Sequence, residues 1–124
     1  MIIHESNTYT EEEIRANRLE WLEALESGKY GQTRGTLKRS EGFCCLGVVC
    51  ELFDSSKWAH INNGYVYQLD GIMLYGHLPA VYQQALAMTA EVHDRCINLN
   101  DWQFFSFISI ATYLRDTWNL PKED

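Results

Sequence analysis

The chain has 124 residues, of which 46% are hydrophobic and 13% aromatic, and its formal net charge is -7. This length is enough for one well-filled core and too short for two ordinary domains, so we expect a single domain over residues 1–124. The negative charge argues against general affinity for nucleic acid or anionic membrane, because both require a positive protein surface. No apolar stretch approaches the roughly 20 residues of a membrane span, and the first residues lack the pattern of a signal peptide, so we expect a cytoplasmic protein.

The first predicted helix covers residues 11–27. Thr10 and Glu13 have the spacing of a capping box, and the acidic residues that follow Thr10 suit the positive end of a helix. Gly28 is placed to end the helix in a left-handed conformation. Apolar residues recur at helical spacing and predict a buried face: Ile14, Trp21, Leu22 and Leu25.

A basic segment follows, from residue 28 to residue 40, in an otherwise acidic chain. It carries four of the ten basic residues and no acid: Lys29, Arg34, Lys38 and Arg39. Residues 33–39 predict a short strand, and Gly31 and Gly35 allow a close approach of backbone. One interpretation is an edge strand whose charges discourage aggregation and pair with glutamates of the first helix; the other is a site for a phosphate or another anion.

Residues 43–53 are apolar almost all the way round a helix, which predicts a buried central helix on which the other elements pack. Gly47 would let a neighbouring backbone come close to it. The four cysteines do not resemble a secreted disulfide framework, so we expect reduced, buried thiols: Cys44, Cys45, Cys50 and Cys96. Their spacing, and that of the histidines, matches no zinc-binding pattern, so no metal is expected.

The second half of the chain predicts a hairpin and two helices. Residues 65–69 and 72–75 flank Asp70-Gly71, a pair typical of a type I′ turn. We expect a small antiparallel sheet of about three strands that includes residues 33–39, then helices over 79–88 and 107–118, the latter capped by Ser106. The resulting fold class is α+β, with four or so helices around the central helix.

Three groups of residues form recognisable motifs: Trp21-x-x-Ala24-Leu25-x-Ser27-Gly28-x-Tyr30-x-Gln32, Gly42-Phe43-Cys44-Cys45-Leu46-Gly47-Val48-x-Cys50, and Leu99-Asn100-Asp101 with Ser106-Phe107-x-x-Ile110-Ala111. Together they resemble a widespread family of small uncharacterised proteins carried by tailed bacteriophages and prophages. The chain departs from the family pattern at Trp102 to Phe105, where a small or glycine-containing turn is usual. The resemblance implies a phage-encoded accessory protein in the host bacterial cytoplasm and brings no known activity.

The leading functional hypothesis is a non-enzymatic binder that counters host defence by sequestering a nucleotide-derived signal. Guanidinium and ammonium groups bind phosphates, aromatic rings stack on a base, and amide or carboxylate groups bind its polar edges. No cofactor is expected. The residues assigned to these roles are Arg34, Lys38 and Arg39 for phosphate, Trp21 or Tyr30 for stacking, and Gln32, Asn100 and Asp101 for polar edges.

Alternatives come from other functional classes. A protein–protein inhibitor of a host factor would use the acidic face of the first helix: Glu12, Glu13, Glu20, Glu23 and Glu26. A cysteine hydrolase would need Cys44 or Cys45 as nucleophile and His60, His77 or His93 as base. A helix-turn-helix at the C-terminal end is disfavoured because residues 107–118 contain a single basic side chain, Arg115. A homo-oligomer formed through the hairpin tyrosines Tyr65, Tyr67 and Tyr75 remains open.

Overall fold

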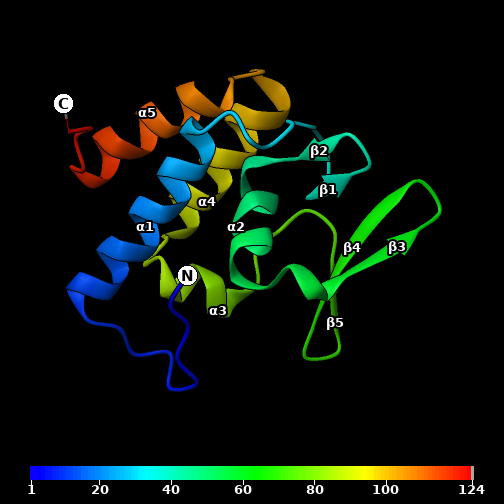
Figure 1. The fold of residues 1–124 in the computed structure, drawn as a ribbon, viewed down its shortest axis with the longest axis horizontal. Helices are drawn as coiled ribbons and strands as arrows, with labels where there is room; N and C mark the ends of the chain where they lie inside the picture. Colours follow the sequence, from blue (N-terminus) through cyan, green and yellow to red (C-terminus); the bar gives the residue numbers. More distant parts are fainter. Residues whose placement is uncertain (124) are drawn as a thin grey trace.

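The computed structural model describes residues 1–123, which fold into an α+β arrangement of helices and two small antiparallel sheets (Figure 1). The α-helices are α1 (Glu11–Glu26), α2 (Cys45–Asp54), α3 (Ala80–Ala85), α4 (Ala90–Ile97) and α5 (Phe107–Trp118). One sheet pairs β1 (Lys38–Arg39) with β2 (Gly42–Phe43), and the other has the order β3 (Trp58–Ile61), β4 (Gly64–Leu69), β5 (Ile72–Leu74). A 3-10 turn, η1 (Ser55–Lys57), follows α2, and a π-helical turn, η2 (Asn98–Trp102), follows α4.

Helix α2 is the buried centre, as its all-round apolar sequence predicts. Every residue from Cys45 to Cys50 is buried, and α1, α3 and α4 all contact this helix. The helix starts at Cys45 and not at residue 43 as predicted, because Phe43 belongs to β2 and Cys44 has an extended backbone. Cys44 is the N-cap residue, and its sulfur accepts a hydrogen bond from the Gly47 N–H. On the other side of α1, α5 lies alongside it (Figure 1).

The helix ends follow the capping signals in the sequence where such signals exist. Thr10 and Glu13 form the predicted capping box of α1, Gly28 has a φ of 75°, and Ser106 caps α5. Helix α3 is shorter than the predicted range 79–88. It ends at Ala85 because Ala87, two residues later, adopts a left-handed φ of 46°. In this turn, the carbonyl groups of Leu86 and Ala87 accept hydrogen bonds from the Arg18 guanidinium.

The hairpin prediction is confirmed, and the predicted third strand of its sheet is wrong. Asp70 and Gly71 have φ values of 50° and 78° between β4 and β5, as a type I′ turn requires. The remaining strand of that sheet is β3, which pairs with β4, whereas Lys38–Arg39 pairs with β2.

The backbone before β1 is occupied by other partners, which explains why residues 33–39 do not join the larger sheet. The Leu37 N–H donates to the Tyr75 carbonyl (2.7 Å), and the Leu37 carbonyl accepts from the Cys44 N–H (3.0 Å). Leu37 itself is fully buried against α2. A Cβ at Gly47 would overlap the Leu37 carbonyl oxygen, so the predicted close approach of backbone at Gly47 is confirmed.

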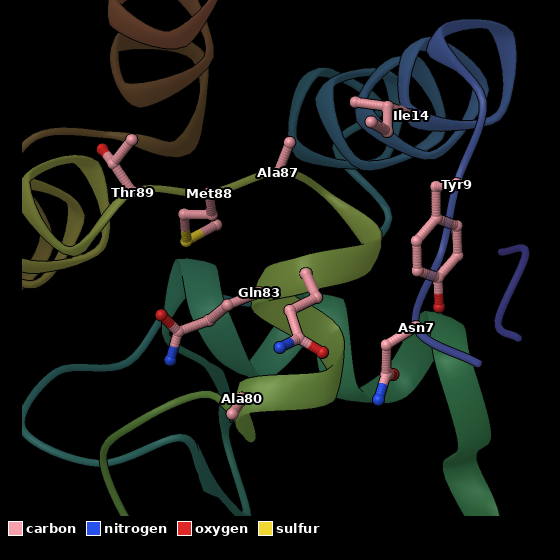
Figure 2. Close-up of a pocket in the computed structure, with 9 residues that line it drawn as sticks. Asn7, Tyr9, Ile14, Ala80, Gln83, Ala87, Met88 and Thr89 are labelled. Carbon is pink, nitrogen blue, oxygen red and sulfur yellow. The ribbon is translucent and has the colours of Figure 1, made fainter. Parts of the chain in front are cut away.

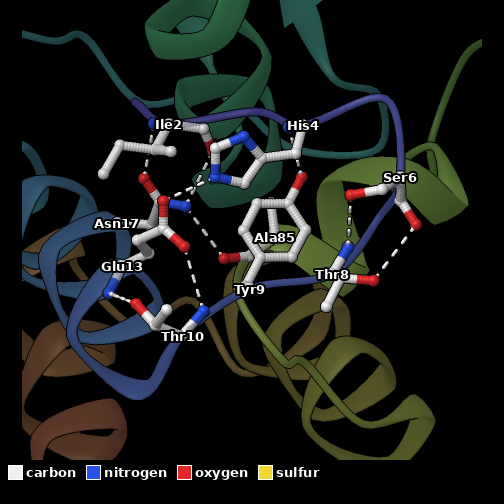
Figure 3. A network of polar contacts seen from close by, with 9 residues as sticks. All are labelled: Ile2, His4, Ser6, Thr8, Tyr9, Thr10, Glu13, Asn17 and Ala85. Atoms are coloured by element: carbon white, nitrogen blue, oxygen red, sulfur yellow. Dashed lines mark hydrogen bonds and ion pairs between the residues drawn. The ribbon is translucent and has the colours of Figure 1, made fainter.

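The buried side-chain amide of Asn17 in α1 joins the N-terminal segment to the end of α3 (Figure 3). The Asn17 side chain accepts from the Ile2 N–H (2.6 Å) and donates to the carbonyls of Ile2 and Ala85, both at 2.9 Å. The His4 ring lies beside Tyr9 and bonds the carboxylate of Glu13. Within residues 1–123, no helix has the length and apolar character that crossing a membrane requires.

Candidate functional site

The predicted ligand-binding residues lie in several different environments. Trp21 is in the interior: it is fully buried, its indole N–H donates to the Cys45 carbonyl (3.0 Å), and its ring packs against Trp118. A ligand therefore has no access to this ring in the folded protein. Its role is to join α1 to the start of α2.

Gln32, Asn100 and Asp101 meet in what we call the amide clasp. The fully buried Asn100 donates from Nδ2 to the Thr33 carbonyl (2.9 Å) and to Asp101 Oδ1 (2.8 Å). Its Oδ1 accepts from Gln32 Nε2 (2.9 Å) and from the Cys45 N–H (3.3 Å). An asparagine side chain offers two donors and two acceptor positions, so Asn100 is fully satisfied by the chain itself.

The clasp therefore joins distant parts of the sequence and has little left to offer a ligand. Gln32 also donates to the Phe105 carbonyl (2.8 Å), so it ties the basic segment to the loop after η2. The bond from Cys45 adds the first residue of α2. The prediction that Gln32, Asn100 and Asp101 act together is met by their positions, but their hydrogen bonds stabilise the fold.

Lys38 lies within an aromatic cluster of its own chain. Its ammonium nitrogen is 4.4 Å from the ring centre of Tyr65 and 5.1 Å from those of Phe43 and Trp58. Cation–π attraction of this kind holds an ammonium group without neutralising it. Tyr30 belongs to the same cluster, because its ring packs edge-on against Phe43 at 5.9 Å between centroids.

The two arginines of the basic segment are less engaged. The Arg34 guanidinium lies 4.8 Å from the ring centre of Phe104, and its buried Nε has no hydrogen-bond partner among residues 1–123. Arg39 is exposed. None of the four basic residues of this segment forms an ion pair within the described part of the chain, and the expected pairing with helix-one glutamates is not found there.

Glu26 of α1 pairs with an arginine outside the basic segment. Arg115 of α5 binds it through two hydrogen bonds, from Nε (2.7 Å) and Nη2 (2.8 Å). These bonds lower the pKa of Glu26 below its ordinary value and raise that of Arg115. The Glu26 carboxylate is therefore already engaged by Arg115 and is not paired with the basic segment.

Beside Arg34 is an exposed aromatic surface that the sequence analysis did not identify as a site. The exposed fractions of its members are high for such large apolar side chains, and Phe104 adopts a left-handed φ of 56°. The only sequence signal was the departure from the family pattern at residues 102–105. We define the aromatic surface as Trp102 (75% exposed), Phe104 (66%), Phe105 (36%) and Ile108 (62%).

The cysteines are unpaired and buried, as predicted, and they lack the features of a nucleophile. Burial raises the pKa of the Cys44 thiol to about 12, and a hydrogen bond with Cys96 together with burial raises that of Cys45. Catalytic thiols have a lowered pKa and solvent access. The ring of buried His93 is engaged by the Leu78 N–H and by Asp94, and no three metal-ligating side chains share a site among residues 1–123.

Hollows in the surface lie away from the predicted residues. One of about 550 Å³ is lined by Asn7 and Tyr9 of the N-terminal segment and by residues of α3 and the turn after it, Ala80 and Ala87 among them (Figure 2). None of the predicted ligand-binding residues lines this hollow or four others, of about 260–510 Å³. The basic segment and the aromatic surface lie outside these five hollows.

Residues 11–117 match the family model of a domain of unknown function, DUF8296. The chain belongs to this family. No curated protein and no solved structure matches it. The DUF8296 match begins with α1 and ends within α5, so it contains both the amide clasp and the aromatic surface, whereas the N-terminal segment lies outside it.

Proposed function

We propose that this DUF8296 protein is a non-enzymatic binding protein that docks on a protein partner through its aromatic surface. The observation that carries the proposal is the exposure of Trp102, Phe104 and Ile108, which lie close together in the sequence from the last residue of η2 to the first turn of α5. Exposed apolar patches on a folded chain mark interaction sites, and aromatic residues and arginine dominate the binding energy of protein interfaces.

The charge around the aromatic surface specifies the partner. Arg34 lies against Phe104 and has no ion pair within the described residues, in a chain whose net charge is -7. A complementary partner would have an apolar recess that receives the aromatic side chains. It would also place carboxylates next to Arg34. We therefore infer a partner with an apolar recess bordered by acidic residues.

The shape of the face favours a protein over a nucleotide. Small ligands bind in concave sites that bury most of their surface, and the basic segment lines none of the five hollows described above. Gln32, Asn100 and Asp101 are engaged with each other. The sequestering of a nucleotide-derived signal consequently ranks below the docking of a protein.

The resemblance to phage and prophage proteins suggests where the partner is found. An accessory protein of a phage acts in the host bacterial cytoplasm, so the partner proposed here is a host protein, with defence factors as the first class to test. The support for this part of the proposal is the motif resemblance alone.

The test uses two isoleucines of nearly equal exposure on different parts of the fold. Ile108 (62% exposed) belongs to the aromatic surface, and Ile72 (61%) lies on β5. Wild-type protein, Ile108→Ala and Ile72→Ala are used to capture proteins from a bacterial lysate, and each captured protein is then purified and titrated by calorimetry. We expect Ile108→Ala to weaken binding about tenfold and Ile72→Ala by less than about twofold.

Two results would overturn the proposal. The first is equal affinity of every purified candidate for the two alanine variants. The second is a nucleotide-sized mass excess in native mass spectra of the purified protein that is lost on denaturation and on Arg34→Ala substitution, which would restore the nucleotide hypothesis.

A further inference from the structure

A second hollow, of about 510 Å³, shares Asn7 with the one in Figure 2 and has a different chemical character. It is bounded by the end of α2, the β4–β5 turn, the start of α3 and the N-terminal segment. Its volume is within the range of small-molecule sites, roughly 300–1,000 Å³. Residues of all four of these segments line it.

One wall of this hollow is apolar and rigid. The rings of Phe53 and Tyr82 are stacked, with centroids 4.2 Å apart and planes inclined by 17°. Tyr82 is buried, and its hydroxyl is fixed by a 2.7 Å hydrogen bond to Tyr67. Leu69 and Val81 extend the wall, so the hollow offers a preformed apolar surface to a ligand.

Among the polar side chains around this wall, acidic groups outnumber basic ones. Three carboxylates line the hollow, from Glu5, Asp54 and Asp70, and no lysine or arginine does. The histidine that lines it, His4, bonds the carboxylate of Glu13 (Figure 3). Lys57, whose charge reaches Asp54, lines a neighbouring hollow instead.

Both aspartates line the same hollow as Tyr82 and the apolar wall. Hydrogen bonds from Ser56 lower the pKa of Asp54, and they use one of its two oxygens, Oδ1. Burial raises the pKa of Tyr82, and the charges of Asp54 and Asp70 contribute to the rise. The hollow therefore combines an apolar wall with a rim that carries three carboxylates and no lysine or arginine.

The geometry points to a binding site for an organic cation, an ammonium or guanidinium group carried on an aliphatic or aromatic body. The body lies against Phe53, Leu69 and Val81, and the cationic group remains at the rim between Asp54 and Asp70, where it is partly hydrated. A free amine and the side chain of a basic residue in a peptide share this chemistry. The site is separate from the aromatic surface and does not depend on the proposed function.

The test is a titration followed by amide resonances in two-dimensional NMR spectra. The free-amine probes are tryptamine and phenethylamine, and their controls are indole-3-propionate and phenylpropionate, which replace the ammonium group by a carboxylate. A capped Ala-Arg-Ala tripeptide represents the peptide source. We expect the cationic probes to shift resonances of Leu69, Asp70 and Val81 with dissociation constants of roughly millimolar or below, and the carboxylates to leave them in place.

Asp70→Asn removes one carboxylate without disturbing the turn, because asparagine before glycine is favoured in a type I′ turn. Glu91→Gln, on the exposed first turn of α4, is the control with the same change in net charge. Since one exposed charge pair is worth about 0.2–1 kcal/mol, Asp70→Asn should weaken cation binding by a factor of about 1.4 to 5, and Glu91→Gln should have no effect. Ile108→Ala should bind the probes like the wild type.

Three outcomes would overturn the inference: no shift of these resonances at millimolar concentrations of any cationic probe, equal binding of the carboxylate analogues, or equal effects of Asp70→Asn and Glu91→Gln. Binding of the tripeptide but not the amines would assign the site to a basic peptide segment, and the reverse would assign it to free amines. Both support the shared chemistry.

Discussion

The amide clasp and the aromatic surface are neighbours in sequence and opposites in exposure. Asn100 is fully buried and makes four hydrogen bonds, whereas Trp102, two residues later, has three quarters of its surface in solvent. The polar motif residues that suggest ligand binding hold the fold together, and the side chains free to bind lie where the chain departs from the motif. A recognisable motif in this protein therefore marks its architecture.

The largest effect that we expect is on the labelling rate of the buried thiols next to the amide clasp. Cys44 and Cys45 are buried at the start of α2, so labelling should require unfolding. With an unfolding free energy of at least about 5 kcal/mol, iodoacetamide should react more than about a thousandfold more slowly with folded than with urea-unfolded protein. Mass spectrometry of quenched samples measures both rates. Rapid labelling of one cysteine in the folded state would revive the cysteine hydrolase hypothesis.

The same thiols give the stability a pH dependence. Burial raises the pKa of Cys44 from about 9.0 to about 12, and the pKa values of Cys45 and Cys50 are raised too. The unfolded thiols ionise first as the pH rises, so the contribution of these groups is complete below about pH 9 and is lost as the pH rises toward 12. Urea unfolding between pH 7 and pH 10.5 should show a falling midpoint. A rising midpoint would contradict the burial of these groups.

Removal of the central amide should be the most destabilising polar change. Asn100→Ala leaves the Thr33 carbonyl and the Cys45 N–H without partners, and each buried unpaired group costs about 1–3 kcal/mol. We expect a loss of about 3 kcal/mol in the free energy of unfolding, measured by urea denaturation. Asn98→Ala, whose side chain bonds only the exposed Gln103 among the described contacts, is the control and should cost less than about 1 kcal/mol.

Gln32 should contribute less than Asn100 and be coupled to it. Gln32→Ala removes bonds to Asn100 and to the Phe105 carbonyl, which is worth about 1–2 kcal/mol. Gln103→Ala, which loses one exposed hydrogen bond, serves as its control. In a double-mutant cycle, the combined loss for Gln32→Ala and Asn100→Ala should fall short of the sum by at least about 0.5 kcal/mol. Strict additivity would mean that the two side chains do not act as one clasp.

The aromatic surface should behave in the opposite way. Phe104→Ala removes a side chain that is 66% exposed, so the free energy of unfolding should change by no more than about 0.5 kcal/mol. Phe107→Ala, three residues later, removes a buried ring and should cost about 3 kcal/mol. Comparable losses for the two variants would mean that Phe104 is part of the core.

Local signals in the sequence were enough to predict much of the fold. The capping box at Thr10, the Asp70-Gly71 turn and the apolar residues around α2 each specify a structure through neighbouring residues, and each is present. Strand β3 was not predicted, because Trp58–Ile61 has no clear alternation of apolar and polar residues. The left-handed Ala87 that ends α3 carries no glycine or asparagine signal.

The candidate site was harder to predict because its properties arise between distant segments. Three of the hydrogen-bond partners of Asn100 are residues 32, 33 and 45. The residues next to Asn100 in the sequence therefore predict neither its hydrogen bonds nor its burial. The exposure of Trp102 and Phe104 was equally hidden, since large aromatic residues are usually assigned to the core. The positive segment is visible in the sequence, whereas its lack of ion pairs within residues 1–123 could be seen only in the structure.

The most direct test is to separate stability from binding with one variant of each region. The purified partner from the capture experiment is titrated by calorimetry into wild-type protein, Gln32→Ala and Trp102→Ala. We expect Trp102→Ala to retain its stability and lose binding by at least about tenfold, and Gln32→Ala to lose stability and bind like the wild type. Intact binding by Trp102→Ala together with weakened binding by Gln32→Ala would contradict the account, because it would move the binding function from the aromatic surface to the clasp.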